Sequence, residues 1–187
     1  MYIKKLQLTS IAILLLCAAP VYAESDESET ILITEFMAIN NNTLEDEDGD
    51  FPDWIELHNP GSSAVNLAGW YLTDNPGILN KWGFPGITIE AGAYLVVFTS
   101  GKNRIDPAAN LHTNFRLSGS GEYLAIVEPG GVTISHSYSP MFPAQRADVS
   151  YGIYSSQYTY LTEPTPATAN TLGDYVLPPV FSITRGY

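Results

Sequence analysis

Turn-forming residues divide the middle of this chain into short strand-like runs, and this punctuation limits its possible folds more than any other feature. Gly- and Pro-containing turn sequences recur about every ten residues, with clear cases at 59–61, 74–77, 118–121 and 129–131. No window of adequate length shows a sustained apolar repeat of about 3.6 residues, and Gly or Pro would interrupt most attempted helices. We therefore expect an all-β fold, and this pattern alone leaves a sandwich and a barrel open.

The runs between the turns have the β-branched and aromatic residues that are typical of strands. Trp54, Trp70 and Trp82 lie within them, so we expect these indoles to pack in the core, with an exposed platform for carbohydrate as the alternative. The expected strands cover residues 31–37, 53–58, 64–67, 70–73, 81–84, 87–89, 94–99, 111–117, 122–127 and 132–138.

Residues 1–23 have the layout of a secretory signal peptide. Lys4 and Lys5 precede an apolar run at 11–19, and Val21-Tyr22-Ala23 places small residues where a signal peptidase cleaves. The run is shorter than the roughly 20 apolar residues that span a bilayer. We therefore expect export and cleavage before Glu24, with the mature protein secreted or at the cell surface and the periplasm as a further destination.

Charge and cysteine content exclude several classes of function. The chain has 8 Lys and Arg against 20 Asp and Glu, a formal net charge of −12, and the loss of Lys4 and Lys5 on cleavage would make it −14. This balance argues against binding to nucleic acid or to anionic membranes. The single cysteine, Cys17, lies in the expected signal peptide, so the mature protein would have neither disulfides nor cysteine-based zinc or thiol chemistry.

Several segments, in order along the chain, resemble the bacterial lamin-tail domain. They are Ile33-Thr34-Glu35-Phe36-Met37-Ala38, the loop at 46–52, Asp53-Trp54-Ile55-Glu56-Leu57-His58-Asn59-Pro60, and residues 65–74, 82–85, 89–98 and 111–117. The resemblance covers residues 31–152 and implies an immunoglobulin-like β-sandwich. It also implies a non-catalytic module attached to other domains, and it supplies no catalytic residues.

The remaining segments predict a multidomain arrangement. Residues 24–30 form an acidic spacer, and residues 153–179 are rich in Thr, Pro, Ser and Tyr, which is typical of a semi-extended linker. Residues 180–187 resemble the opening strand of a chitobiase-type C-terminal or fibronectin-like module. We expect this chain to be a piece of a longer exported protein; the alternative is a tail that packs along the sandwich.

The acidic loop at 45–50 is the sharpest local feature with chemical potential. Asp46, Asp48 and Asp50 alternate around Gly49, and such carboxylates suit a hard cation, so they are candidate calcium ligands. The loop does not follow the EF-hand template, because Leu57 stands where the bidentate Glu would be. The alternative is a solvated acidic loop that keeps the protein soluble and binds no metal.

Other catalytic patterns are weak, so we expect no enzyme activity and no cofactor besides this candidate calcium. His58, His112 and His136 form no metal-binding motif and are expected at exposed strand or turn positions. Glu35, Asp53 and Glu56 could pair as glycosidase carboxylates, but any acidic β-protein offers such pairs. Nucleophile-elbow and phosphate-binding motifs are absent from the sequence.

The sequence favours an exported interaction or structural module that contacts protein or glycan. The better candidate for a contact surface is the tyrosine-rich stretch, which lies outside the expected strands and contains Tyr151, Tyr154, Tyr158 and Tyr160. Two other functions stay open. One is an accessory domain of an exported hydrolase whose catalytic part is absent from this chain, and the other is a calcium-dependent adhesion module.

Overall fold

The computed structural model describes residues 30–173, which form twelve β-strands and no helix. The expected signal peptide and the strand expected at 180–187 lie outside these residues. No helix among residues 30–173 is long and apolar enough to cross a membrane. The strands are β1 (Leu32–Met37), β2 (Trp54–His58), β3 (Val65–Asn66), β4 (Tyr71–Thr73), β5 (Trp82–Gly83), β6 (Thr88–Ile89), β7 (Tyr94–Phe98), β8 (Leu111–His112), β9 (Leu124–Val127), β10 (Ile134–Tyr138), β11 (Ser150–Tyr154) and β12 (Gln157–Leu161).

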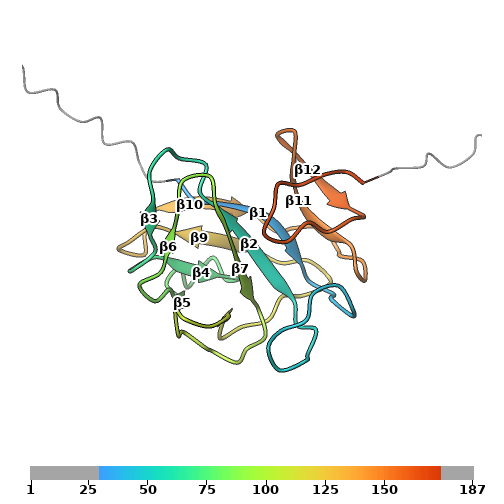
Figure 1. The fold of residues 1–187 in the computed structure, drawn as a ribbon, viewed down its shortest axis with the longest axis horizontal. Helices are drawn as coiled ribbons and strands as arrows, with labels where there is room; N and C mark the ends of the chain where they lie inside the picture. The colour runs from blue at the N-terminus through green and yellow to red at the C-terminus, as the bar shows by residue number, and fades with distance from the viewer. Residues whose placement is uncertain (1–29, 174–187) are drawn as a thin grey trace, which may run out of the picture.

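Two sheets face each other, so the expected all-β fold is confirmed and its form is a sandwich (Figure 1). One sheet has six strands in the order β12-β11-β1-β2-β7-β8, and the other has four in the order β10-β9-β4-β5. β3 and β6 form a separate two-stranded ribbon. Every strand pair is antiparallel except β7 and β8, which run parallel.

The core lies between the two sheets and is almost entirely apolar. Ile33 and Phe36 from the six-stranded sheet pack with Leu72 and Ile126 from the four-stranded sheet, and all four are fully buried. The three indoles are buried as expected, at 0% for Trp54, 1% for Trp70 and 2% for Trp82. Trp54, however, lies on the other face of the six-stranded sheet, in a second small cluster with Met37 and Phe98. Burial of this apolar surface is the main force that holds the sheets together.

A bulge in β1 decides which side chains enter the core. Ile33 pairs with Leu57 of β2. The next residue along β2, Glu56, pairs with Glu35 and not with Thr34, so Thr34 is an extra residue in β1. Strict alternation from Ile33 would have pointed Glu35 into the core. The bulge instead leaves Glu35 beside Glu56 on the outer face, meaning the face of the six-stranded sheet that points away from the four-stranded sheet.

Side chains of β10 replace a strand partner along the first part of β1. β11 pairs with β1 only at Glu35 and Phe36, which leaves the backbone of Ile31 and Ile33 without a strand on that side. Ser135 Oγ accepts from Ile31 N and donates to Ile31 O, both at 2.9 Å. His136 Nδ1 accepts from Ile33 N at 3.3 Å, and Tyr138 OH donates to Ile33 O at 3.1 Å. These bonds join the two sheets at an otherwise open edge.

The expected linker at 153–179 is wrong in its first part. Residues 150–161 form the β11–β12 hairpin, whose two-residue turn at Ser155 and Ser156 has positive φ at both positions. Residues 162–173, here called the strap, run back across β11 (Figure 1). Asn170 Nδ2 donates to Thr34 O at 2.9 Å and to Ile153 O at 2.8 Å, which fixes the strap to the sheet. The alternative of a tail that packs along the sandwich therefore describes these residues.

Replacement of His136 by Phe should lower the free energy of unfolding by about 1 to 3 kcal/mol at about pH 8, because the buried Ile33 amide loses its acceptor. Burial lowers the pKa of His136 below its ordinary value of 6.5. Stability from neutral His136 is therefore present above that value and lost as the pH falls through the lowered pKa.

Denaturant unfolding of the wild type and of His136→Phe from about pH 8 to about pH 5 checks this. The difference between the two should shrink on acidification. Tyr158→Phe is the control, because it removes only the hydroxyl that lies 3.1 Å from His136 Nε2. A difference that does not change with pH would show that the Nδ1 contact is not what His136 contributes.

Candidate functional site

The acidic loop is folded around the buried carboxylate of Asp46. Asp46 Oδ1 accepts the backbone amides of Asp48 and Asp50, both at 3.0 Å, and Asp46 N donates to Asp50 O at 2.8 Å. Gly49 has a φ of 81°, a backbone conformation that favours glycine and closes this turn. The residue type at position 46 is thus explained locally, because Asp is well suited to accept amides of the turn that follows it.

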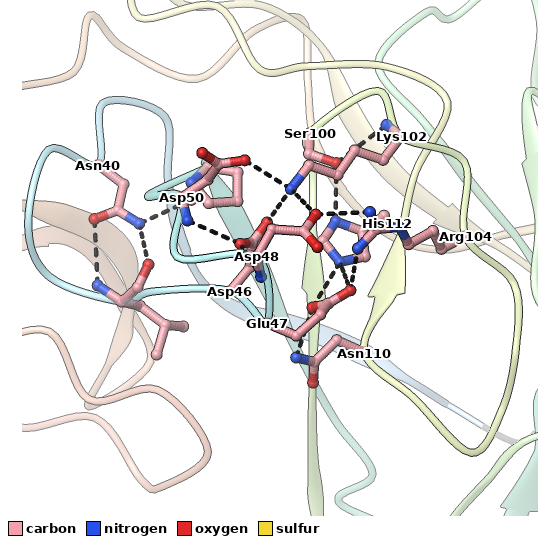
Figure 2. A network of polar contacts seen from close by, with 12 residues as sticks. Asn40, Asp46, Glu47, Asp48, Asp50, Ser100, Lys102, Arg104, Asn110 and His112 are labelled. Carbon is pink, nitrogen blue, oxygen red and sulfur yellow. Dashed lines mark hydrogen bonds and ion pairs between the residues drawn. The ribbon is translucent and has the colours of Figure 1, made fainter.

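A lysine from a distant loop occupies the centre of the three candidate calcium ligands (Figure 2). Lys102 Nζ lies 2.5 Å from Asp46 Oδ2, 2.7 Å from Asp48 Oδ2 and 2.9 Å from Asp50 Oδ2. Arg104 pairs with Asp48 at 2.6 Å and also with Glu47. Four carboxylates thus face two permanent cations, so half of the negative charge of the cluster is neutralised from within.

The pKa values of the cluster follow from these contacts. Burial alone would raise the pKa of Asp46, but hydrogen bonds from Lys102 and from the amides of Asp50 and Asp48 outweigh it and lower the pKa. Burial would lower the pKa of Lys102, yet its three carboxylate partners raise it. Both partners are therefore held in their charged forms at neutral pH.

His112 links this cluster to Ser100 in the order of a Ser-His-acid triad. His112 Nδ1 lies 2.8 Å from Ser100 Oγ, and Nε2 lies 3.0 Å from Glu47 Oε1. An ionised carboxylate only accepts, so Nε2 carries a proton toward Glu47, and Nδ1 contacts the hydroxyl of Ser100. A nucleophilic serine must be reachable, but Ser100 is 3% exposed and His112 is 0% exposed. The arrangement therefore joins the loops, and its serine is closed to a substrate. The burial of His112 also corrects its expected exposed position.

The calcium ligands expected from the sequence do lie together. One carboxylate oxygen from each of Asp46, Asp48 and Asp50 falls within 4.8 Å of the others. Carboxylate oxygens are what Ca²⁺ prefers, and the donor set fits it. Binding there, however, requires the Lys102 ammonium to leave the position that it holds. Calcium binding at this loop therefore stays a prediction, in which the ion would compete with the Lys102 ammonium for the three carboxylates.

A second polar cluster lies on the outer face, where the strap covers Glu35 and Glu56. Both carboxylates are 0% exposed. Glu35 accepts from Ser150 Oγ, from Thr165 N at 3.1 Å and from Thr165 Oγ1 at 3.0 Å. Glu56 accepts from Thr34 Oγ1 at 2.6 Å and from Ala167 N at 2.7 Å. Side chains of the sheet and amides of the strap thus supply donors to every carboxylate oxygen.

Burial is the main cause of the raised pKa of both Glu35 and Glu56. The pKa of Glu56 rises to about 7, and the nearby charge of Glu35 contributes to this rise. Asp53, the third carboxylate considered for glycosidase chemistry, is not part of this pair. It accepts from Asn40 N at 3.3 Å, and burial raises its pKa to about 6. A glycosidase acid must reach a substrate oxygen, which the covered pair cannot do while the strap is in place.

A hollow of about 350 Å³ opens on the outer face beside this pair. Its wall includes the rings of His58 and Tyr94, which stack at 4.3 Å between centroids, and the side of Asn170 in the strap. Tyr154 lines the same hollow from β11. An apolar wall with a few polar groups at its rim is typical of small-ligand sites.

The remaining residues singled out in the sequence lie apart from these clusters. Tyr151, Tyr158 and Tyr160 are strand residues of the β11–β12 hairpin, and Tyr158 is 53% exposed. His136 is half-buried against β1, which also differs from the expected exposed position. Sequence reasoning missed Lys102, Ser100 and the strap contacts, because no local motif marks them. Lys102 and the strap donors to Glu35 and Glu56 contact residues more than fifty positions away, whereas Ser100 with His112 and Asn170 with Ile153 are closer in sequence.

One comparison with known families gives a match. The family model described as Lamin Tail Domain matches residues 24–140. No curated protein matches the chain. The family match ends after β10, so the β11–β12 hairpin and the strap lie beyond the matched residues.

Replacement of Lys102 by Met should raise the affinity of the acidic loop for calcium, because it removes the competing ammonium and keeps all three carboxylates. Thermal unfolding with about 2 mM CaCl₂ should show a larger stabilisation of Lys102→Met than of the wild type. Lys102→Arg keeps a cation and is the matched control. If calcium leaves the melting temperature of Lys102→Met unchanged, the loop is not a calcium site.

Glu56→Gln should flatten the pH dependence of stability. The pKa of Glu56 is raised to about 7 in the folded protein from an ordinary value of 4.5, so its contribution is present at low pH and is lost as the pH rises through 7. From about pH 5 to about pH 8 the wild type should lose about 2 kcal/mol more than the variant. Urea unfolding at both pH values measures this. Equal losses would mean that Glu56 ionises in the folded protein as readily as in the unfolded chain.

Proposed function

The chain belongs to the lamin tail domain family, a family of non-catalytic immunoglobulin-like domains, and from this premise we propose that it is an exported interaction module. The module contacts protein or glycan as part of a larger secreted or cell-surface protein. The signal-peptide pattern at 1–23 supports export. The acidic surface supports a partner that is neither nucleic acid nor an anionic membrane.

One observation carries the non-catalytic part of the proposal: both clusters that resemble catalytic sites are closed by the chain itself. The Ser100 hydroxyl is buried beneath the acidic loop, and the Glu35 and Glu56 carboxylates are covered by the strap. A catalytic group needs access to its substrate and a position for the reacting atom. In these clusters the chain's own donors and cations take those positions.

The hollow beside the strap supports glycan as one class of partner. Tyr94 and His58 present a stacked aromatic pair, and the amide of Asn170 lies at the rim. The apolar face of a sugar ring packs well against aromatic rings, while its hydroxyls bond to polar groups at the edge. The hollow is large enough for one or two sugar rings on ordinary volumes for ligand sites.

Two alternatives follow from other features. An accessory domain of an exported hydrolase would use the same contact surfaces, and its activity would belong to another part of the protein. A calcium-dependent adhesion module would use Asp46, Asp48 and Asp50, and the excess of carboxylates over cations there favours it.

The proposal predicts no turnover and predicts binding at the hollow. The full chain should leave glycoside, ester and peptide substrates intact, and Glu56→Gln and Ser100→Ala should behave as the wild type does. In native gels that contain a soluble neutral polysaccharide, the wild type should be retarded and Tyr94→Ala should not. Tyr71→Ala, on the other sheet, is the control. Reproducible hydrolysis that is lost in Glu56→Gln or Ser100→Ala would overturn the non-catalytic proposal; equal mobility of all variants would exclude the hollow as a glycan site.

A further inference from the structure

The four edges of the two larger sheets in residues 30–173 differ in how well they are protected against pairing with another strand. β5 and β8 have two residues each, and the free side of β8 is bridged by Arg104, whose carbonyl accepts from His112 N at 2.9 Å. β10 is interrupted by a bulge between Ile134 and His136. Short length, cover and bulges are the usual devices that keep an edge from pairing.

Although Arg146 lies over the ring of Tyr160 and Tyr160 OH donates to Ala144 O, β12 is neither short nor bulged. It is five residues long, Gln-Tyr-Thr-Tyr-Leu, and its register with β11 is unbroken from Gln157 to Leu161. It contains no charge and no proline, although the whole chain carries a net charge of −12. Among the described residues β12 has a strand neighbour on one side only. Such an edge is a ready template for a further strand.

The turn of the hairpin fixes which backbone groups face the open side. Tyr154 and Gln157 close the two-residue turn and form a hydrogen-bonded pair, so the same pattern continues at Thr159 and Leu161. The N–H and C=O groups of Tyr158 and Tyr160 therefore point away from β11. The side chains alternate as well: Thr159 pairs with Gly152 on the outer face, and Tyr160 pairs with Tyr151 on the inner face.

The sequence of β12 is self-complementary about Thr159. In an antiparallel pair of two copies with Thr159 opposite Thr159, Tyr158 of each copy lies opposite Tyr160 of the other. The backbone groups that face outward then form the hydrogen-bonded pairs, and the tyrosines of both copies meet on one face. Aromatic pairs are among the favourable cross-strand pairs, and a two-fold axis brings the same patch of each copy together.

We propose that β12 is a homodimerisation edge, at which a second copy of this chain pairs antiparallel about Thr159 and joins the two six-stranded sheets into one. This goes beyond the proposed function, since it needs neither a glycan nor a foreign protein. The hairpin lies outside residues 24–140, so the edge belongs to the part of the chain that the family match does not cover. Two chains of net charge −12 repel one another at long range, so salt should tighten the pairing.

Charge placed at position 159 tests the proposal, because the two-fold axis sets residue 159 of each copy directly opposite itself. Sedimentation velocity of the full chain should show a monomer–dimer equilibrium that shifts toward dimer at higher salt. Thr159→Lys and Thr159→Glu should each weaken the dimer at least roughly tenfold through like-charge repulsion. Thr159→Gln, which is uncharged, should dimerise as the wild type does. An equimolar mixture of the Lys and Glu variants should regain the dimer as a heterodimer.

Each other result overturns the proposal. A wild type that stays monomeric at about 100 μM in high salt means that the edge is covered within the chain or reserved for a strand of another protein. A dimer that both charged variants retain uses a different surface. A mixture that stays monomeric shows that residue 159 does not face its own copy. Thermal unfolding of each variant verifies that the hairpin substitutions leave the fold intact, and the uncharged variant keeps the test valid if one charged variant does not fold.

Discussion

The single extra residue in β1 sets the arrangement on which the rest of the sandwich depends. Because Thr34 and Glu35 together oppose Glu56, the strand reverses its alternation after Ile33 and sends Phe36 into the core. The same shift points Glu35 outward beside Glu56. A bulge of this kind removes one residue pair from the pairing of β1 with β2. It also places two acidic side chains next to each other, and neither can be buried without hydrogen-bond partners.

The outer face is completed by segments that have no strand structure of their own. At one end, the loop after β1 places Leu44 against Met37, Trp54 and Phe98, and Asn40 holds that loop by donating to Leu44 O and Pro52 O. At the other end, the strap donates amides to Glu35 and Glu56. Gly152 lets the bulged part of β1 approach β11 closely, since a Cβ there would come within 2.2 Å of Thr34 O and within 3.1 Å of Asn170 Nδ2 of the strap. The outer face of the six-stranded sheet is therefore covered at both ends, and the carboxylates of Glu35 and Glu56 are used in internal contacts.

The sequence predicted the features that depend on local pattern. Strands bounded by Gly or Pro, such as β2 and β7, and the burial of Trp54, Trp70 and Trp82 follow from alternation and turn chemistry. The bulge at Thr34 could not be predicted, because alternation is read from one strand and a bulge is a property of a pair. The contact of Lys102 with Asp46 spans fifty-six positions, so no local pattern marks it. The composition of the strap predicts a linker because Pro- and Thr-rich segments have the same composition whether or not they are packed.

Residues 162–173 are an integral part of this domain, held by the two buried carboxylates. Native-state hydrogen exchange of the amides of Thr165 and Ala167 tests this most directly, because these two N–H groups are the donors to Glu35 and Glu56. Both amides should be protected to nearly the same degree as those of β1 and β2. If both amides exchange at the rate of an unstructured peptide, residues 162–173 are not packed on the sheet and the segment is a linker.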